Sequence, residues 1–507
     1  MPYNLRKRKL PEPEAPPARA ISTAKKRRTK KEDASKSQQL ETEVQPLESS
    51  TIAREKKVVR KKSPPLVSIP EAAPEKKDSK KKSPTPISIP DIALEKKVIR
   101  KKSPPPVVDK KSTERRQLSF GADSCGELGL GKIGVTKKLP TQVPIKEPVK
   151  QIACGPMHTL TLTESGQVYS YGCNDEGALG RSTDGDETVE ATPTIVPVAN
   201  KIIKISAGDS HSAVLTDKNE VFIWGNFRDE HGSVGLLPSC EGQATFEPIQ
   251  ILPDTKFKDI ASGSNHMLAL DTDGNVYSFG VGAQGQLGRL KPEELGENGN
   301  SHPITADNRE LFLTPQKVSL KDVDPQRTFI CDAIYAGNFS SFATNTDKKK
   351  NRLAGWGLNN YFQLGYKGQK GQLVQNFPRR STFTCSTSMI NVACGQHHTL
   401  FLTKTGRVYS AGRPEYGMLG LGKVDKEVCP AKFVESLGNS IVDISAGINT
   451  SFAVDCDGKL YAWGMGGTNL GLGEEDDLKI PTEVKNLADE KVLRVSAGGS
   501  FTSIIVE

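Results

Sequence analysis

The sequence has few of the features that mark membrane or secreted proteins. No stretch reaches the roughly 18 uninterrupted apolar residues of a membrane helix, and no apolar signal core follows the charged N-terminus. The nine cysteines are an odd number and include no CxxC pair, so neither a disulfide framework nor a zinc site is indicated. We therefore expect a soluble chain in a reducing compartment, without a metal or another cofactor.

The sequence also lacks the residue patterns of covalent catalysis. No nucleophile, base and orienting acid stand in motif spacing, and no carboxylate cluster resembles a metal site. The segment GVGAQG at 280–285 fits GxGxxG, but no helix pattern follows it, and it occupies the same repeat position as GCNDEG and GRPEYG. A hydrolase or a lectin would need an acid pair or a metal constellation, so we predict that the protein is not an enzyme with covalent chemistry.

Aromatic residues are almost absent from residues 1–116, where Tyr3 is the only one. Proline, serine, lysine and glutamate dominate there, and such a segment cannot bury enough apolar surface to offset its chain entropy. It carries 32 of the 69 basic and 15 of the 60 acidic residues, which leaves 37 basic and 45 acidic residues in 117–507. We predict a disordered tail of net charge +17 (32 − 15) before a body of −8 (37 − 45).

The basic residues of the tail come in blocks separated by prolines. One block is KKRRTKK, which supplies Lys25, Lys26, Arg27, Arg28, Lys30 and Lys31. Blocks of this kind suit recognition by an import receptor and sequence-independent contact with nucleic-acid phosphates; a merely solubilising tail is the alternative. Phosphorylation of the Ser-Pro sites at Ser63, Ser83 and Ser103 would cancel part of this charge.

The rest of the chain is an internal repeat. IACGPMHTLTLTESGQVYSYGCNDEGALG at 152–180 returns from Ile205, from Ile260, from Val392 and from Ile444, with a weaker copy from Ile334. The copies alternate polar and apolar residues with period two, are joined by hairpin-type turns, and gain a fourth extended segment that contains proline. Four strands per unit of about 50 residues predict the blades of a β-propeller.

The two ends of the repeat region complete one blade. Residues 117–131 form a lone second half of the repeat, and VSAGGSFTSIIVE at the C-terminus is a lone first half. Joining them gives a seventh blade and leaves no edge unpaired. We predict an all-β, seven-bladed propeller over 117–507, closed by its N- and C-terminal strands, with a polar surface insertion at 291–309.

The pattern AxGxxHTxxLTxxGxVYSxGxxxxGxLG resembles the repeat of the regulator of chromosome condensation family over essentially all of 117–507. This resemblance implies a guanine nucleotide exchange factor for the small GTPase Ran that acts at chromatin in the nucleus. It implies as partners Ran in its nucleotide-free and GDP forms, nucleosome histones and DNA, and an import receptor through the tail, with no membrane. A scaffold of the same superfamily, which binds a chromatin or ubiquitin-pathway partner without exchange, is the alternative.

One segment departs from the repeat. After Trp224 the chain reads GNFRDEHGSVGLL, with extra polar residues before the glycines. In the exchange-factor subfamily this position is similar to a β-wedge that pushes against the nucleotide-binding loops of the GTPase. The predicted wedge consists of Gly225, Asn226, Phe227, Arg228, Asp229, Glu230, His231 and Gly232, with Arg228 and Asp229 as polar contacts; a merely longer loop is the alternative.

The resemblance also implies a set of GTPase-contacting residues. The matching positions are His158, Asp209, Asn265, Arg289, His397 and His398. Asn265 replaces an aspartate of the subfamily pattern, and Phe501 replaces a histidine in the last copy. Because His158, His211, His266 and His398 recur at one repeat position, a structural role between blades is weighed equally with partner contact for each of them.

Overall fold

The computed structural model describes residues 114–507 except for 295–302, 324–327, 348–349, 369–371, 382, 384–387, 474–475 and 488. Residues 1–113 of the predicted tail, with its block at 25–31 and its Ser-Pro sites, lie outside the described residues and stay predictions.

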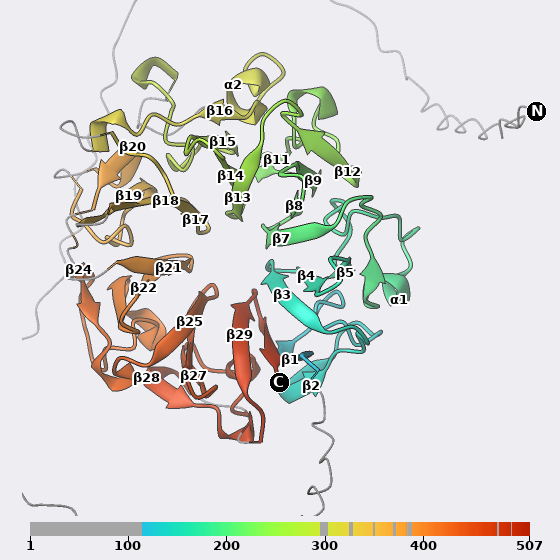
Figure 1. Ribbon diagram of the computed structural model, residues 1–507, viewed down its shortest axis with the longest axis vertical. Helices are drawn as coiled ribbons and strands as arrows, with labels where there is room; N and C mark the ends of the chain where they lie inside the picture. The colour runs from blue at the N-terminus through green and yellow to red at the C-terminus, as the bar shows by residue number, and fades with distance from the viewer. Residues whose placement is uncertain are drawn as a thin grey trace, which may run out of the picture. The chain divides into compact units, whose positions relative to one another are not determined.

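Seven four-stranded antiparallel sheets surround a central channel (Figure 1), which confirms the predicted propeller. The innermost strands are β3 (Val149–Cys154), β7 (Ile202–Ala207), β13 (Phe257–Ser262), β17 (Ala333–Ala336), β21 (Met389–Cys394), β25 (Ile441–Ala446) and β29 (Val492–Ala497). The second strands are β4 (His158–Thr163), β8 (His211–Thr216), β14 (His266–Asp271), β18 (Ser340–Asp347), β22 (His398–Thr403), β26 (Thr450–Asp455) and β30 (Phe501–Val506). The third strands are β5 (Val168–Gly172), β9 (Val221–Gly225), β15 (Val276–Gly280), β19 (Lys350–Leu358), β23 (Val408–Gly412), β27 (Leu460–Gly464) and β1 (Arg116–Ala122). The outer strands are β6 (Thr194–Ile195), β12 (Thr245–Ile251), β16 (Gln316–Lys317), β20 (Val374–Arg380), β24 (Val428–Phe433), β28 (Leu478–Glu483) and β2 (Thr136–Gln142).

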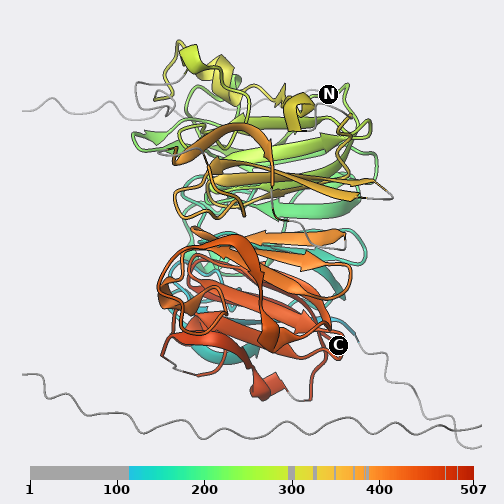
Figure 2. The ribbon, with the colours of Figure 1, turned by 90° about the vertical axis from the view of Figure 1, so that its left-hand side faces the viewer.

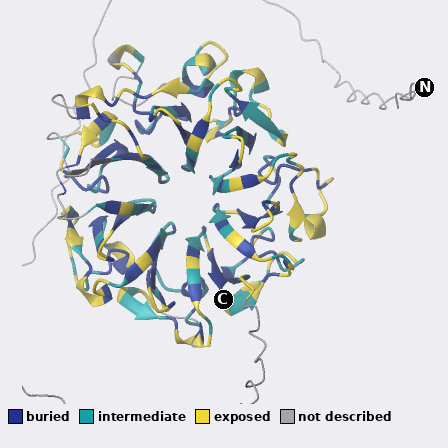
Figure 3. Ribbon diagram, in the orientation of Figure 1, coloured by how far each residue is buried: buried dark blue, intermediate teal, exposed yellow. Residues whose placement is uncertain are grey.

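Burial explains the sequence of each strand type. The second strands are packed on both sides by neighbouring blades, and every residue of β4, β8, β14, β22, β26 and β30 is buried. The innermost strands are only partly buried: in β3 and β7 the first and fourth residues are buried, and the second, Lys150 or Ile203, is exposed (Figure 3). The outer strands carry prolines at the edge, which lack the N–H that would extend the sheet to another chain. These are Pro140, Pro248, Pro378, Pro430 and Pro481.

The predicted closure of the ring is confirmed. The sheet order β2-β1-β30-β29 joins the first described strands to the last, and Gln117 pairs with Ile505 in the β1–β30 ladder. A hydrogen bond of 2.7 Å between the Ser119 and Ser503 hydroxyls lies in the same buried seam. Seven sheets therefore close without an unpaired inner strand.

The ring has two distinct faces. Every innermost strand ends at the face that carries the loops 155–157, 208–210, 263–265, 337–339, 395–397, 447–449 and 498–500, which we call the glycine-loop face. A Cβ on Gly155 would lie 2.4 Å from the carbonyl oxygen of Gly208, and one on Gly208 would lie 2.6 Å from that of Gly263, so glycine is required where these loops pack. The C-terminus lies on the opposite, terminal face, at the right in Figure 2.

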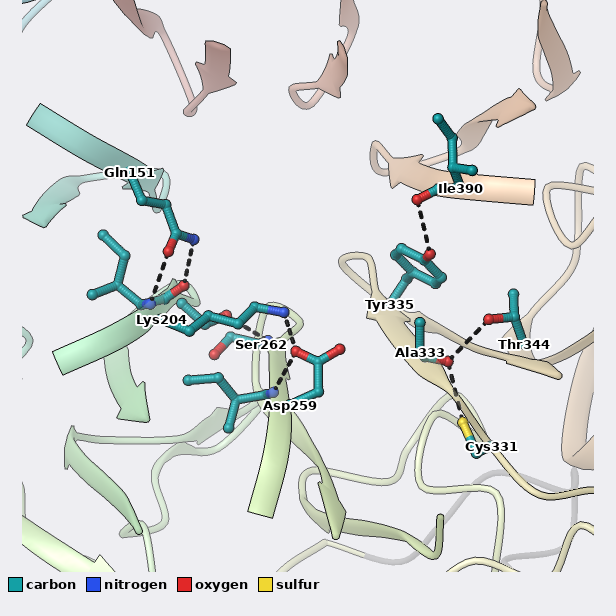
Figure 4. A network of polar contacts seen from close by, with 12 residues as sticks. Gln151, Lys204, Asp259, Ser262, Cys331, Ala333, Tyr335, Thr344 and Ile390 are labelled. Carbon is teal, nitrogen blue, oxygen red and sulfur yellow. Dashed lines mark hydrogen bonds and ion pairs between the residues drawn. The ribbon is translucent and has the colours of Figure 1, made fainter. Parts of the chain in front are cut away.

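Side chains of the innermost strands join several neighbouring blades across the channel wall (Figure 4). The Gln151 amide bonds the backbone N–H and carbonyl of Ile205 at 3.2 and 3.0 Å, and Lys204 pairs with Asp259. Tyr335 donates its hydroxyl to the Ile390 carbonyl at 3.3 Å. The channel is therefore built as a belt of contacts between blades.

Short elements decorate this ring. The α-helices are α1 (Glu187–Glu190) and α2 (Arg309–Leu313), and the 3-10 helices are η1 (Pro238–Cys240), η2 (Pro292–Glu294), η3 (Lys321–Val323), η4 (Glu415–Gly417), η5 (Glu435–Leu437), η6 (Thr468–Leu470) and η7 (Lys485–Leu487). The end of the predicted insertion leads into α2, whose Phe312 and Leu313 are buried. A separate two-stranded sheet consists of β10 (Arg228–Asp229) and β11 (Gly232–Ser233).

Candidate functional site

The predicted wedge is a small hairpin on the glycine-loop face. Gly225 is the last residue of β9, and the Asn226 N–H donates to the carbonyl of Ser210 at 2.8 Å, so the chain leaves the blade beside the loop 208–210. β10 and β11 then pair antiparallel through Arg228–Ser233 and Asp229–Gly232. We call residues 226–235 the hairpin; it begins one residue later than the sequence predicts and extends past Gly232.

An aromatic residue anchors the base of the hairpin in the core. Phe227 is fully buried and packs edge-on against His211, with ring centroids 4.7 Å apart, and against Phe279 at 5.8 Å. A buried phenylalanine is expected to hold the hairpin more firmly than polar contacts alone. The base of the segment is therefore held in the apolar core.

Glu176, from the preceding blade, holds both strands of the hairpin. Its carboxylate accepts from the Asn226 side-chain amide at 2.6 Å and from the Ser233 hydroxyl at 3.0 Å, and it pairs with the guanidinium of Arg228. The Asn226 side-chain oxygen in turn accepts the Gly235 N–H at 2.8 Å. The sequence analysis assigned no role to Glu176, although it stands at a repeat position where the other blades have no acid.

Asn265, from the following blade, links the hairpin to Asp209. Its side-chain oxygen accepts the Arg228 N–H at 2.9 Å, and its amide donates to the Asp209 carboxylate at 3.4 Å. Burial raises the pKa of the Asp209 carboxyl, although a hydrogen bond with Ser264 opposes the shift. The structure thus brings together three predicted site residues, Asp209, Asn265 and Arg228.

The tip of the hairpin is open to solvent. The side chains of Glu230 and His231 are 82% and 60% exposed. Asp229 accepts the N–H of His231 at 2.8 Å through one carboxylate oxygen and that of Ile304 at 3.3 Å through the other. An exposed tip on a held base is the form that a protruding contact element requires.

His158 and His398 occupy the structural position that recurs between blades. Both rings are fully buried, and their Nε2 atoms lie 2.9 Å from the Ser212 hydroxyl and 2.8 Å from the Ser451 hydroxyl of the next blade. Neither ring offers a surface to a partner, so of the two roles weighed for them, the placement fits the structural one. His266 makes the same bond to Ser341, and Phe501 fills the position in the last copy with a buried ring.

Arg289 is bound within its own blade. Its guanidinium donates to the carbonyls of Ser278 at 3.3 Å and Phe312 at 3.2 Å, and so holds α2 against β15. Burial lowers its pKa to about 10. Arg181 stands at the same repeat position and holds α1 to β5 through the carbonyls of Ser170 and Val189. Arg289 lies apart from the Asp209–Arg228 group, and this clamp accounts for its placement.

His397 lies on the equivalent loop of another blade. It is half-buried, and its ring centroid lies 5.0 Å from that of Tyr361. The Arg413 guanidinium lies 4.9 Å from the centroid of the Tyr361 ring. Burial and the charge of Arg413 lower the pKa of His397. It forms a second group of polar side chains on the glycine-loop face, three blades away from Asp209.

The mouth of the channel lies between these groups. A cavity of about 350 Å³ is lined there by the glycine loops of the blades and by Asp209. Within the described part of the chain, no cluster of three or more histidine, cysteine or acidic residues is placed to hold a metal. Nor does any helix among the described residues have the length and apolar content of a membrane span. The arrangement suits contact with another macromolecule.

Comparisons with known proteins agree with this architecture. A family model described as the RCC1-like domain matches residues 116–504. The chain is 40% identical over 395 residues to a regulator of chromosome condensation from Xenopus laevis, across 77% of this chain and 89% of that protein. It is 31% identical over 436 residues to the guanine nucleotide exchange factor SRM1 of Saccharomyces cerevisiae, across 76% and 85%. The crystal structure of Prp20p from Saccharomyces cerevisiae, described with its binding properties to Gsp1p and histones, is similar with a TM-score of 0.68 at 29% identity, across 78% and 92%.

Proposed function

Because the chain belongs to the family of the regulator of chromosome condensation, we propose that it is a guanine nucleotide exchange factor for the small GTPase Ran. The observation that carries the proposal is the hairpin held on the glycine-loop face beside Asp209. The yeast relative at 31% identity is itself named an exchange factor, which supports the same assignment.

An exchange factor works by differential binding. It binds the nucleotide-free GTPase more tightly than the nucleotide-bound form, and by reciprocity this weakens the hold of the GTPase on its nucleotide. The hairpin presents Arg228, Glu230 and His231 to solvent and would press on the loops that hold phosphate and magnesium. Asp209 and His397, on the same face, would stabilise the empty GTPase.

We further propose that the protein acts in the nucleus at chromatin. Prp20p is described with binding to histones, and the tail predicted from the sequence has a charge of +17 (32 − 15) that suits DNA phosphates. The block at 25–31 would bind an import receptor. Histones and DNA would then hold the exchange factor where Ran-GTP is needed for nuclear transport, spindle assembly and envelope formation.

The test is release of a fluorescent guanine nucleotide from purified Ran·GDP, with the full chain at catalytic amounts. We expect strong acceleration, reduced about tenfold by Asp209→Ala, which corresponds to ~1.4 kcal/mol of binding to the transition state. Lys201→Ala, an exposed cation near the terminal face, is the control and should leave the rate unchanged. No acceleration by a folded chain would favour the scaffold without exchange activity.

A further inference from the structure

Resting on this proposed function, we infer that Glu176 is the positioning residue that sets the hairpin against the GTPase. In this role Glu176 takes part in no covalent step and acts through the hairpin, without direct contact with the GTPase. It belongs to the blade before the hairpin and reaches across to it, so that the hairpin is held between Glu176 on one side and Asn265 on the other.

The hairpin cannot hold its own position. β10 and β11 have two residues each and share two pairs of residues, whereas an isolated two-stranded hairpin is at best marginally stable in water. Phe227, before β10, and Val234, directly after β11, are buried in the same apolar cluster and fix the base of the hairpin. Both anchors lie below the paired residues and leave the turn without an apolar contact of its own. The orientation of the tip must come from polar contacts.

Glu176 supplies these contacts to both strands at once. An ionised carboxylate accepts about four hydrogen bonds, and this one receives them from Asn226 before β10, Arg228 within β10 and Ser233 within β11. Its side chain is 18% exposed, and its bond to the buried Asn226 is the best shielded from water, whereas the Arg228 side chain is 49% exposed. Glu176 is thus the group that ties the two strands to one external point.

The loop that carries Glu176 is itself rigid. The Asn174 amide donates to the Arg181 carbonyl and the Thr183 hydroxyl, both at 3.1 Å, and its oxygen accepts the Leu179 N–H at 3.0 Å. Because this loop is fixed by its own hydrogen bonds, the Glu176 carboxylate can hold the hairpin in one orientation, which a carboxylate on a mobile loop could not do.

The repeat itself does not require an acid here. The equivalent residue before the glycine is Cys125, Gln284 or Tyr416 in other blades. Glu176 is therefore fitted to its neighbour, the blade that carries the hairpin, and not to the general construction of the ring.

The experiment compares Glu176→Gln and Glu176→Ala with the wild-type full chain in nucleotide release from Ran·GDP over a range of Ran concentrations. A misplaced hairpin should slow the exchange step more than it weakens association with Ran. We therefore expect the maximal rate to fall about 10- to 100-fold while the KM stays within about threefold. The melting temperature should change by no more than about 2 °C. Glu187→Gln, an exposed acid on α1 of the same blade, is the matched control.

A second readout needs no GTPase. Hydrogen exchange of the amides in 226–235 should be faster in Glu176→Gln than in the wild type, and Ser233→Ala should add little to Glu176→Ala because it removes a bond already lost. A wild-type rate in Glu176→Ala, or a loss that only follows a fall in melting temperature, overturns the inference. If the wild type itself does not accelerate release, the proposed function fails, and hydrogen exchange alone then decides whether Glu176 positions the hairpin: faster exchange supports it, and unchanged exchange overturns it.

Discussion

Acid should destabilise the propeller through the four buried imidazoles of its described residues. Burial lowers the pKa of His158 to about 4 and those of His211, His266 and His398 to about 3, from an ordinary value of 6.5. The unfolded chain therefore binds more protons than the folded chain from pH 6.5 downward. The stability due to neutral imidazoles is complete above pH 6.5 and is lost as the pH falls toward 3.

The expected loss is large against the total stability of a domain. At pH 5 each imidazole costs about 2 kcal/mol, or roughly 8 kcal/mol for all four. Buried carboxyls act in the opposite sense. Burial raises the pKa of Asp123 to about 7 and that of Asp443 to about 6, and together these two offset roughly 4 kcal/mol; burial also raises the pKa of Asp209. The free energy of unfolding should thus fall by about 4 kcal/mol between pH 7 and pH 5, compared with a typical total of roughly 5–15 kcal/mol.

His211 allows the imidazole contribution to be isolated. Neither of its ring nitrogens has a hydrogen-bond partner in the described structure, so His211→Leu breaks no hydrogen bond. In urea unfolding, the stability of this variant relative to the wild type should rise by about 2 kcal/mol from pH 7 to pH 5.

Thr450→Val is the control, because Thr450 occupies the same repeat position and does not titrate. Its effect on the free energy of unfolding should be the same at both pH values. If His211→Leu also shifted stability equally at pH 7 and pH 5, the reasoning from buried neutral imidazoles would be refuted.

Three further outcomes are expected. Deleting residues 496–507 removes β30, so the ring should lose its cooperative thermal transition, and a stable truncated protein would contradict the closure. Arg289→Ala should lower the melting temperature, by the equivalent of about 2 kcal/mol for its lost hydrogen bonds, and leave the rate of nucleotide release within twofold of the wild type. A slower release at an unchanged melting temperature would instead indicate that Arg289 contacts the GTPase. Aspartate at Ser63, Ser83 and Ser103 should weaken DNA binding and flatten its dependence on salt in a titration, and unchanged affinity would exclude a phosphorylation switch in the tail.

The sequence predicted the ring because its information is local and repeated. The recurrence of the repeat, the alternation along the strands and the two half-blades at the ends each predict one property of a propeller, and the β1–β30 ladder confirms the closure that the half-blades predict. The position of the hairpin was also predictable, since GNFRDEHG breaks the repeat. Its anchors were not, because Glu176 and Asn265 come from other blades and a side chain that crosses between blades leaves no periodic signal.

The recurring histidines show the limit of reasoning from a repeat. Recurrence indicates a common environment but does not say whether that environment is a loop surface or a seam between blades. His397 and His398 are neighbours in the sequence, yet the first is half-buried on the glycine-loop face and the second is fully buried beside Ser451. Arg181 and Arg289 follow the same GxLG pattern, and their clamps depend on helices that lie after them in the chain.

The hairpin also explains one of the two seams at which a recurring bond between blades is missing among the described residues. In five of the described blades, the residue that follows the recurring histidine position carries a hydroxyl that donates to a backbone carbonyl of the preceding blade. The acceptor is the second residue of the GxLG motif: Ser212 donates to Ala178 and Ser341 to Gln286, both at 2.8 Å. All three tryptophans of the chain, Trp224, Trp356 and Trp463, donate to these same carbonyls.

The blade that carries the hairpin has SVGLL in place of GxLG and so offers no such carbonyl. The blade after it has Met267 and Phe279 where the others have the hydroxyl and, in three cases, the tryptophan. His211 consequently faces no hydroxyl and packs on Phe227 instead. At this seam acceptor and donors are lost together, because a buried hydroxyl or indole N–H without a partner would cost more than an apolar replacement. The other seam without the bond keeps its donor: the Thr399 hydroxyl is buried and has no hydrogen-bond partner in the part of the chain that the structure describes. The hairpin is therefore accommodated by the apolar seam behind it as well as by the polar contacts at its sides.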